Sequence, residues 1–414
     1  MRKMRDSGIE WVGAIPQDWQ LSKIGSLYTQ RNEKVSDKDY QPLSVTMQGI
    51  LPQLATAAKT DDGDNRKLVR VGDFAINSRS DRRGSCGISP LDGSVSLINI
   101  ILTPRTAMHP GYYNWLFHTT LFADEFYKWG HGIVADLWTT RWQEMKSITV
   151  PVPEYAEQER IAAFLDAECA EIDAVLEKTR ASIEEYKKLK QAVITQAVTK
   201  GIRGDRPMKN SGIEWIGTCP LNWTVCRIKN VIFPQEKEVL PDDEIITCFR
   251  DGEVTLRKNR REDGFTVSFT EHGYHGVDKG DLVIHGMDAF AGAIGCSDSR
   301  GKTTPVVHTC KTAGNNRFFM YFLRSMAYGN ILMDLSNGVR IRSSDFRNFA
   351  KLGVFGAVMP PLEEQNEIVD YIDGIVIQMD RLIQKKENLL TEIENYKKSL
   401  IYEYVTGKKE VHPL

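Results

Sequence analysis

The chain carries one long stretch twice, as PEYAEQERIAAFLDAECAEIDAVLEKTRASIEEYKKLKQAVITQAVTKG at residues 153–201 and as PPLEEQNEIVDYIDGIVIQMDRLIQKKENLLTEIENYKKSLIYEYVTGK at residues 360–408. Laid on each other without a gap, at an offset of 207 residues, the copies share many positions, among them Glu157/Glu364, Gln158/Gln365, Ile161/Ile368, Asp173/Asp380, Lys190/Lys397 and Thr199/Thr406. Chance does not keep register over such a length, so the sequence indicates an internal duplication.

Both copies have the periodicity of one long helix. Apolar residues recur at steps of four and seven, at Ile161, Leu165, Ile172, Leu176 and Ile183 in the first copy and at Ile368, Ile372, Met379, Ile383 and Leu390 in the second. Such steps place one apolar stripe along a helix. Acidic residues near each start, and Gly201 and Gly407 after the last periodic residues, agree with this prediction.

The apolar stripe of each predicted helix must be buried against another part of the protein. About 45 residues at 1.5 Å each give a rod of roughly 65 Å, which is longer than one small domain can cover. A single helix of this kind would favour a stalk or a dimerisation rod. Because the chain has two copies, we expect them to pack on each other within the chain as a coiled-coil pair.

A second repeat opens each half of the chain. Ser7-Gly-Ile-Glu-Trp-Val-Gly13 returns as Ser211-Gly-Ile-Glu-Trp-Ile-Gly217, and Pro16 and Trp19 return as Pro220 and Trp223. Tryptophans and a proline at fixed spacing favour a buried packing motif over a ligand site. We therefore expect four segments, namely a first head (residues 1–152), a first helix (153–204), a second head (205–358) and a second helix with its tail (359–414).

The two heads share little sequence beyond a few landmarks. Short β-prone runs lie between turn signals, for example at residues 67–76 and 277–284. Several glycines align at an offset of 208, including Gly87 with Gly295. Aromatic stretches at residues 112–129 and 318–335 are expected to form short helices. Each head is thus predicted to be a mixed α/β domain, and two unlike heads on two like helices suggest a protein that reads two different things at a fixed separation.

Composition limits the function classes. The 414 residues suffice for several domains, and 41% hydrophobic and 26% charged residues are ordinary for a globular protein. The sequence has neither an apolar run of membrane-spanning length nor an apolar segment behind its basic N-terminus, so a cytoplasmic protein is expected. Seven cysteines without a CxxC pair indicate a reducing compartment. A net charge of −2 neither indicates nor excludes nucleic-acid binding.

Two enzymatic or metal-binding alternatives are weaker. The segment from Gly295 to Thr303 resembles a phosphate-binding P-loop, but five residues separate its glycines, and Thr304-Pro305 cannot continue directly into the required helix. Histidines and cysteines of the second head could be assembled into a zinc site on paper, yet their spacing is not that of a zinc finger and the first head has no equivalent. We therefore predict neither catalytic residues nor metal ligands in this chain.

Basic clusters in both heads point toward DNA. In the first head they comprise Asn77, Arg79, Arg82 and Arg83, with Arg141 beside Trp138 and Trp142. In the second head they comprise Arg257, Lys258, Arg260 and Arg261, and a looser set of Arg340, Arg342 and Arg347. Arginine can bind phosphates or take guanine O6 and N7 together, and asparagine can read adenine. A solvated loop would explain any one cluster, but their presence in the divergent part of both heads favours sequence recognition.

The duplicated order of motifs resembles the specificity subunits of type I restriction-modification systems. The resemblance covers essentially the whole chain and rests on the opening motifs, on Pro153-Glu-Tyr-Ala-Glu-Gln158 and Pro360-Pro-Leu-Glu-Glu-Gln365, and on Ala197-Val-Thr-Lys-Gly201 and Tyr404-Val-Thr-Gly407. It implies two mixed α/β target recognition domains joined by two long antiparallel coiled-coil helices, related by an internal pseudo-twofold repeat. Each domain would read one half of a bipartite, asymmetric target in double-stranded DNA, and the helices would set the spacer between the halves.

The resemblance also implies partners and cofactors. The helical regions would dock two modification (methyltransferase) subunits and, through them, the restriction (translocase and nuclease) subunits. This chain would hold no cofactor, whereas S-adenosylmethionine, ATP and Mg²⁺ would bind to the partner subunits. Two other functions stay open at this point, namely a scaffold that gathers partners without reading DNA, and a nucleotide-hydrolysing enzyme that uses the segment from Gly295 to Thr303.

Overall fold

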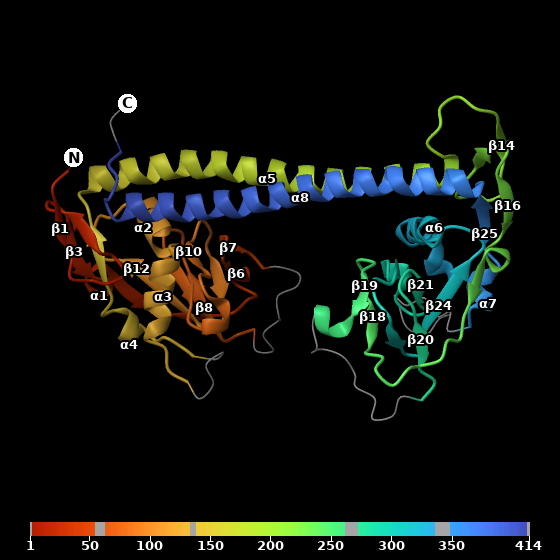
Figure 1. Ribbon diagram of the computed structural model, residues 1–414. Coiled ribbons are helices and arrows are strands. Elements are labelled where there is room, and N and C mark those ends of the chain that lie inside the picture. Colours follow the sequence, from red (N-terminus) through yellow and green to blue (C-terminus); the bar gives the residue numbers. More distant parts are fainter. Residues whose placement is uncertain (1, 54–62, 133–137, 261–271, 336–347, 412–414) are drawn as a thin grey trace. The chain divides into compact units, whose positions relative to one another are not determined.

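The computed structural model of the chain describes residues 2–53, 63–132, 138–260, 272–335 and 348–411 (Figure 1). The chain divides into two compact units. Unit 1 comprises Met1–Arg180 and Asn388–Leu414, and unit 2 comprises Ala181–Glu387. Each long helix therefore contributes one part to each unit, and each head packs with parts of both helices.

Short strands and helices make up the first head. In chain order they are β1 (Met4–Asp6), β2 (Ala14–Pro16), β3 (Gln20–Lys23), α1 (Ile24–Leu27), β4 (Tyr28–Arg31), β5 (Lys34–Val35), β6 (Leu43–Thr46), β7 (Gly49–Pro52), β8 (Arg66–Val69), β9 (Phe74–Asn77), η1 (Ser80–Arg82), β10 (Cys86–Ile88), β11 (Gly93–Val95), β12 (Asn99–Pro104), α2 (Pro110–Phe117), α3 (Thr120–Lys128), α4 (Trp142–Met145) and β13 (Thr149–Val152). The main sheet is antiparallel with the order β10-β9-β12-β4. Helices α2 and α3 supply aromatic residues to the core that covers this sheet.

The second head repeats this plan. Its elements are β14 (Met208–Asn210), β15 (Thr218–Pro220), β16 (Thr224–Arg227), η3 (Ile228–Asn230), β17 (Ile232–Pro234), β18 (Ile246–Cys248), β19 (Val254–Leu256), η4 (Arg257–Asn259), β20 (His275–Val277), β21 (Leu282–His285), η5 (Ala289–Ala291), β22 (Ile294–Cys296), β23 (Gly301–Thr303), β24 (Val307–Thr312), α6 (Asn316–Tyr328), η6 (Ile331–Leu335), α7 (Ala350–Gly353) and β25 (Gly356–Met359). Its main sheet has the order β22-β21-β24-β17.

Four strands of the first head correspond residue by residue to four strands of the second. An offset of 208 carries β9 onto β21, β10 onto β22, β11 onto β23 and β12 onto β24 without a change of length. The shared glycines fit this framework, because a Cβ at Gly87 would lie 2.9 Å from Gly49 Cα and a Cβ at Gly295 would overlap the carbonyl oxygen of Gly252. The heads thus share one backbone framework although their sequences have diverged, and the predicted mixed helix-and-strand fold is confirmed.

The two long helices are α5 (Tyr155–Lys200) and α8 (Leu362–Val405). Their starts differ by the 207 residues that the sequence repeat predicts. Both end as expected, because Gly201 and Gly407 follow with φ angles of +76° and +71°, in the left-handed region where glycine has no steric penalty.

Within each unit, the two helices run antiparallel. In unit 1, Asp173 pairs with Lys397 at 2.6 Å and Arg180 with Glu394 at 2.5 Å, so residue numbers rise along α5 while they fall along α8. In unit 2, Lys190 pairs with Asp380 at 2.5 Å. Because Asp380 and Lys397 are the repeat equivalents of Asp173 and Lys190, the same ion pair occurs once in each unit.

The helix starts are held to the heads by two equivalent clusters, which we call the clasps. In the first clasp, Arg2 forms an ion pair with Glu157, and the indole N–H of Trp19 donates to Glu157 Oε2 at 2.9 Å. In the second clasp, Arg206 pairs with Glu364 at 2.5 Å and lies over the ring of Trp223. These contacts explain why the Glu and Trp positions recur, and Trp19 and Trp223 are buried, as expected for a packing motif.

The glutamine of each helix start links the clasp to the head. Gln158 donates to the carbonyl oxygen of Pro153 at 2.8 Å and accepts a hydrogen bond from the backbone N–H of His109 at 2.8 Å. Gln365 makes the same two contacts, with Pro360 and Asn315, at 2.8 Å each. Both glutamines are buried, so their amides satisfy backbone groups that would otherwise be left without partners.

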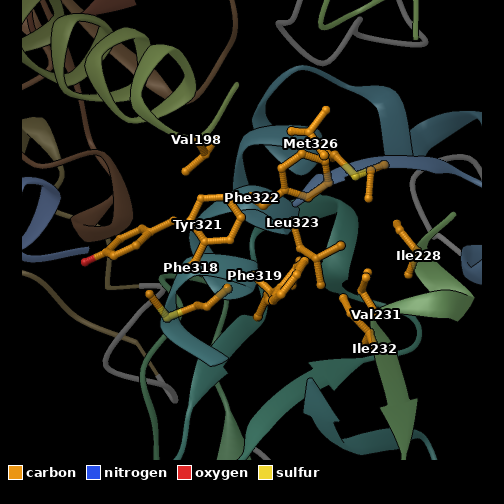
Figure 2. Close-up of a cluster of buried hydrophobic side chains, with 14 of the residues drawn as sticks. Val198, Ile228, Val231, Ile232, Phe318, Phe319, Tyr321, Phe322, Leu323 and Met326 are labelled. Carbon is orange, nitrogen blue, oxygen red and sulfur yellow. The ribbon is translucent and has the colours of Figure 1, made fainter. Parts of the chain in front are cut away.

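The apolar stripes of the helices join the cores of the heads. Ile161 and Leu165 belong to the core of unit 1 together with Leu400 and Val405, and Ile368 and Ile372 belong to the core of unit 2 together with Val198. Figure 2 shows this second core, in which side chains of α6 gather with Val198 of α5 and with the segment that carries Ile228, Val231 and Ile232. The expectation that the twin helix alone covers each stripe is therefore incomplete, because the heads cover the ends.

The predicted aromatic helices are present with one difference between the heads. Residues 112–129 form α2 and α3, which Thr119 separates by capping α3 through its side-chain oxygen. Residues 318–335 form the single helix α6 followed by η6. Among the described residues, no helix is long and apolar enough to span a membrane.

Candidate nucleic-acid interface

Each head has a cavity near the end of its central strand, β9 in the first head and β21 in the second, and near the segment that leads into β12 or β24. At the offset of 208, no described lining residue of one cavity is equivalent to a described lining residue of the other. Asn77 ends β9, and His285, its equivalent at the offset of 208, ends β21. The two cavities are lined by different side chains, so the framework is shared and the chemistry is not.

The cavity of the first head has a volume of about 370 Å³. Its polar lining includes Gln30, Lys67, Arg79 and Arg141. Lys67 donates to the carbonyl oxygen of Asn99 at 2.7 Å, and burial lowers the pKa of its ammonium group. Within the described residues, neither Arg79 nor Arg141 has an ion-pair partner, and both are exposed. These two guanidinium groups are thus available to an incoming anion.

Backbone pairing brings these two arginines together. Residue 79 forms a β-bridge with residue 139, and the backbone N–H of Thr140 donates to the carbonyl oxygen of Ser78 at 3.0 Å. Arg141 then precedes α4, at whose start Glu144 accepts its backbone N–H at 3.0 Å. Two predicted residues that are 62 positions apart in the sequence therefore line one cavity.

The other predicted residues of the first head differ in availability. Asn77 is buried, and its side-chain oxygen accepts the backbone N–H of Arg79 at 3.0 Å. Arg82 is 68% exposed and lies 3.7 Å from Asp81. Arg83 forms an ion pair with Asp124 and lies 5.9 Å from the ring centre of Tyr127. Arg83 would have to leave a carboxylate to bind a phosphate, so its assignment as a DNA contact stays a prediction with a competing partner.

The cavity of the second head has a volume of about 890 Å³. Its polar lining comprises Thr247, Arg250, Asp251, Arg257, Arg260, His285, Asp288, Thr303 and Thr304. Carboxylates hold two of the three arginines, since Arg250 pairs with Asp288 at 2.9 Å and Arg260 with Asp251 at 2.5 Å. Arg260 also lies 4.3 Å from the ring centre of Phe249, and Arg257 donates to Thr247 Oγ1 at 3.3 Å.

The remaining predicted residues of the second head do not join this cavity. Lys258 pairs with Glu244 at 2.5 Å and is not among the lining residues. Arg261, Arg340 and Arg342 lie outside the described residues, as does Arg347. Of the predicted cations in this head, Arg257 and Arg260 are thus the two that the structure places at the cavity.

Sequence reasoning missed several lining residues. Arg250, His285 and Asp288 in the second head, and Lys67 in the first, were not predicted as site residues. The signal for His285 was present, because the offset of 208 that aligns Gly87 with Gly295 also aligns Asn77 with His285. Lys67 gave no such signal, because it becomes a lining residue only through the pairing of β8 with β11.

The segments considered for enzymatic or metal chemistry are structural elements. The two ends of the segment that resembles a P-loop lie in strands β22 (Ile294–Cys296) and β23 (Gly301–Thr303). Burial raises the pKa of the Cys296 thiol to about 12, which disfavours the thiolate that a metal site would need. Among the described residues, no group of three or more His, Cys, Asp or Glu side chains could hold a metal ion.

The helix pair presents apolar residues in equivalent places in each unit. In unit 2, Leu189 of α5 and Leu382 of α8 are 48% and 41% exposed. Their repeat equivalents in unit 1, Tyr396 and Val175, are 55% and 47% exposed. In each unit these two residues lie within two sequence positions of the residues of the interhelical ion pair, Lys190–Asp380 in unit 2 and Lys397–Asp173 in unit 1.

Solved structures share this fold. The chain aligns with a chain from a structural study of complex assembly and conformational transition in the type I restriction-modification system, with a TM-score of 0.70, 14% identity, and coverage of 95% of this chain and 99% of that chain. It also aligns with the crystal structure of the HsdS subunit from Thermoanaerobacter tengcongensis, with a TM-score of 0.50, 16% identity, and coverage of 98% and 100%. This likeness shows a common fold.

A curated relative gives the comparison by sequence. The chain is similar to the type I restriction enzyme StySPI specificity subunit of Salmonella potsdam, with 20% identity over 426 residues that cover 96% of this chain and 90% of that protein. No family model matches the chain. The predicted resemblance to specificity subunits of type I restriction-modification systems is thus confirmed over nearly the whole length.

Proposed function

We propose that this chain is the DNA sequence-recognition subunit of a type I restriction-modification complex, in which each head reads one half of a bipartite, asymmetric target. The observation that carries the proposal is the pair of cavities. Each lies near the end of the central strand of its head. Gln30, Lys67, Arg79 and Arg141 line one cavity, and Arg250, Arg257, Arg260 and His285 line the other. Two domains that recognise different half-sites need a common backbone framework with different side chains at the DNA-contacting positions.

Phosphate contacts supply most of the affinity in protein–DNA complexes, and contacts to base edges supply the specificity. In the first head, Arg79 and Arg141 have the charge and the exposure for such contacts. In the second head, Arg257 and Arg260 line the cavity, and a DNA phosphate would compete with Asp251 for Arg260. A bidentate contact discriminates by roughly 1–3 kcal/mol, so two or three contacts in each head are enough for a short half-site.

The helix pair serves as the spacer in this proposal. Antiparallel pairing within each unit, with equivalent ion pairs between Asp173 and Lys397 and between Lys190 and Asp380, supports one continuous pair of helices as the element that joins the heads. The number of turns between the heads would then determine how many unspecified base pairs separate the half-sites.

The helix pair also docks the partner subunits in this proposal. A surface that occurs twice by internal repeat suits two copies of one partner. Leu189 and Leu382 in unit 2, and Tyr396 and Val175 in unit 1, are exposed apolar residues at repeated positions, and we assign one modification subunit to each pair. Restriction subunits would join through the modification subunits. S-adenosylmethionine, ATP and Mg²⁺ would act in those partner chains, and this chain would carry out no catalysis.

A scaffold without DNA recognition is the competing function, and DNA selection separates the two. The chain is assembled with its cognate modification subunit and offered DNA with randomised sequence at several salt concentrations. The proposal predicts that the selected DNA contains two short conserved blocks at one fixed separation, with affinity that falls steeply as salt increases. DNA binding without any conserved block, by an assembled complex, would overturn sequence recognition and favour the scaffold.

A further inference from the structure

The last residue of the central strand uses its side chain in the same way in both heads. In the first head, Asn77 Oδ1 accepts the backbone N–H of Arg79, two residues later, at 3.0 Å. In the second head, His285 Nδ1 accepts the backbone N–H groups of Met287 at 3.3 Å and Asp288 at 3.1 Å. An amide and an imidazole thus perform the same local task at equivalent positions, which ties the side chain to the turn at the cavity.

This contact determines which tautomer of His285 is present. A nitrogen that accepts two backbone N–H groups carries no proton itself, so the neutral ring bears its proton on Nε2. Burial of the ring lowers its pKa, and the attraction of Asp288 only partly opposes this, while Arg250 and His308 add to it. At neutral pH, His285 is therefore an uncharged residue with a single N–H donor on the edge that faces away from the turn.

The surroundings make this donor the group best suited to read a base. His285 lines the cavity of about 890 Å³, and its side chain is 23% exposed. Two arginines of the same lining, Arg250 and Arg260, are bound to carboxylates, and Arg257 contacts Thr247. A neutral donor with a fixed tautomer can distinguish an acceptor from a donor on a base edge.

We propose that His285 is a specificity-determining residue of the second head, which donates from Nε2 to an acceptor on a base edge, such as O6 or N7 of guanine. This inference rests on the proposed function, namely that the heads read DNA. In the major groove, guanine presents acceptors where cytosine presents its amino donor. A donor with a fixed tautomer at position 285 therefore favours one set of bases at one position of the second half-site.

The test compares three substitutions in the complex with the cognate modification subunit. His285→Asn keeps an acceptor for the turn, as Asn77 does, and offers an amide donor of different reach. His285→Ala removes the acceptor for the turn and the donor for the base. His272→Ala, at an exposed histidine of the same head that does not line the cavity, is the matched control. Each complex selects DNA from a pool in which one half-site is randomised and the other is held at the wild-type sequence.

We expect His285→Ala to lose about tenfold of its base preference at one position of the second half-site, the size of one good base contact. His285→Asn should change the preferred base there, and the first half-site and the His272→Ala complex should behave as wild type. If the wild-type complex prefers bases in both half-sites and the His285→Ala complex keeps the same preference, this inference is overturned and the proposed function is not. A wild-type complex without base preference would overturn the proposed function and this inference together.

Discussion

At the scale of single residues, the clasps show how a few buried charges connect a helix start to a head. Glu364 has a side chain only 2% exposed, and its partner Arg206 is 15% exposed. In the first clasp, Glu157 and Arg2 are 15% and 17% exposed. Removing one partner of a buried pair leaves the other charge without compensation, which costs more than the pair itself contributes.

We therefore expect Glu364→Gln to lower the free energy of unfolding by about 2–4 kcal/mol, and Glu157→Gln to lower it by less. Denaturant titration of the full chain measures the total, and hydrogen exchange measures each unit separately. Protection should fall in unit 2 after Glu364→Gln and in unit 1 after Glu157→Gln. Equal loss of protection in both units after either substitution would contradict a local role for the clasps.

The cations of the first head differ in how they are held, and this leads to a second prediction. Because Arg79 and Arg141 have no ion-pair partner among the described residues, replacing both with alanine should weaken reading of the first half-site by about 2 kcal/mol or more. Arg83→Ala should cost less, because its guanidinium group is bound to Asp124.

Competition between DNAs with one scrambled half-site measures this effect. Arg70→Ala, at an exposed arginine that pairs with Asp92 outside the cavity, is the control. Equal weakening for both half-sites in the double variant would assign Arg79 and Arg141 to general phosphate binding instead of reading.

The candidate site shows what a single sequence reveals about residues. Asn77, Arg79 and Arg141 were predicted because their types suit base and phosphate contacts, and the structure brings Arg79 and Arg141 to one cavity. The ion pairs of Arg83, Lys258 and Arg260 could not be predicted, because their carboxylates come from other loops and from α3. His285 was missed because the heads were compared by identity of residues, whereas the equivalence lies in position and hydrogen bonding.

At the scale of elements, the ends of the helices depend on glycine. Gly407 has a φ of +71°, and a Cβ there would lie 2.6 Å from Pro16 and 2.9 Å from Trp19 of the opening motif. Gly8 has a similar φ of +69°, but a Cβ there would meet nothing within 4 Å. A substitution at Gly8 therefore measures backbone strain alone, whereas one at Gly407 measures backbone strain together with steric contact with the head.

Gly407→Ala is therefore expected to destabilise unit 1 by about 2–4 kcal/mol, from backbone strain of roughly 1–2 kcal/mol and from overpacking against the opening motif. Gly8→Ala should show the strain alone. Thermal unfolding of the two variants gives the comparison. Equal shifts in melting temperature would show that the helix end does not pack tightly on the opening motif.

The elements themselves were predictable to different degrees. The long helices were predictable in length and ends, because a stripe of apolar residues with acidic starts and glycine stops leaves few alternatives. The strands of the heads are three to six residues long in the main sheets, and such short runs carry little periodicity. Aligned glycines gave the offset of 208 from the sequence, but the equivalence of the whole strands became visible only when the hydrogen-bonded order of the sheets was known.

At the scale of the whole molecule, the duplication connects sequence to function. Two units repeat one plan, each with a head and parts of both helices, while the cavities of the heads differ. The net charge of −2 gave no sign of DNA binding, because acidic residues of the helices offset the cations that gather near the cavities. The target sequence is beyond single-sequence reasoning, since base preference depends on side chains in divergent loops.

The spacer role predicts the effect of a change in helix length. Inserting one heptad into both α5 and α8, in the helix pair away from the clasps, keeps the apolar stripe in phase and lengthens each helix by about 10 Å. The preferred separation of the two half-sites should increase by about three base pairs, at roughly 3.4 Å per base pair. Selection from DNA with variable spacing measures this, and an unchanged separation in an assembled, DNA-binding complex would contradict the spacer role.

The most direct test of the central claim is methylation mapping of genomic DNA. Cells that carry this chain with its cognate modification subunit are compared with cells that lack only this chain. The account predicts modified adenines in each half of a split, asymmetric motif, present only when the chain is present. An assembled complex that leaves no chain-dependent methylation would contradict the account.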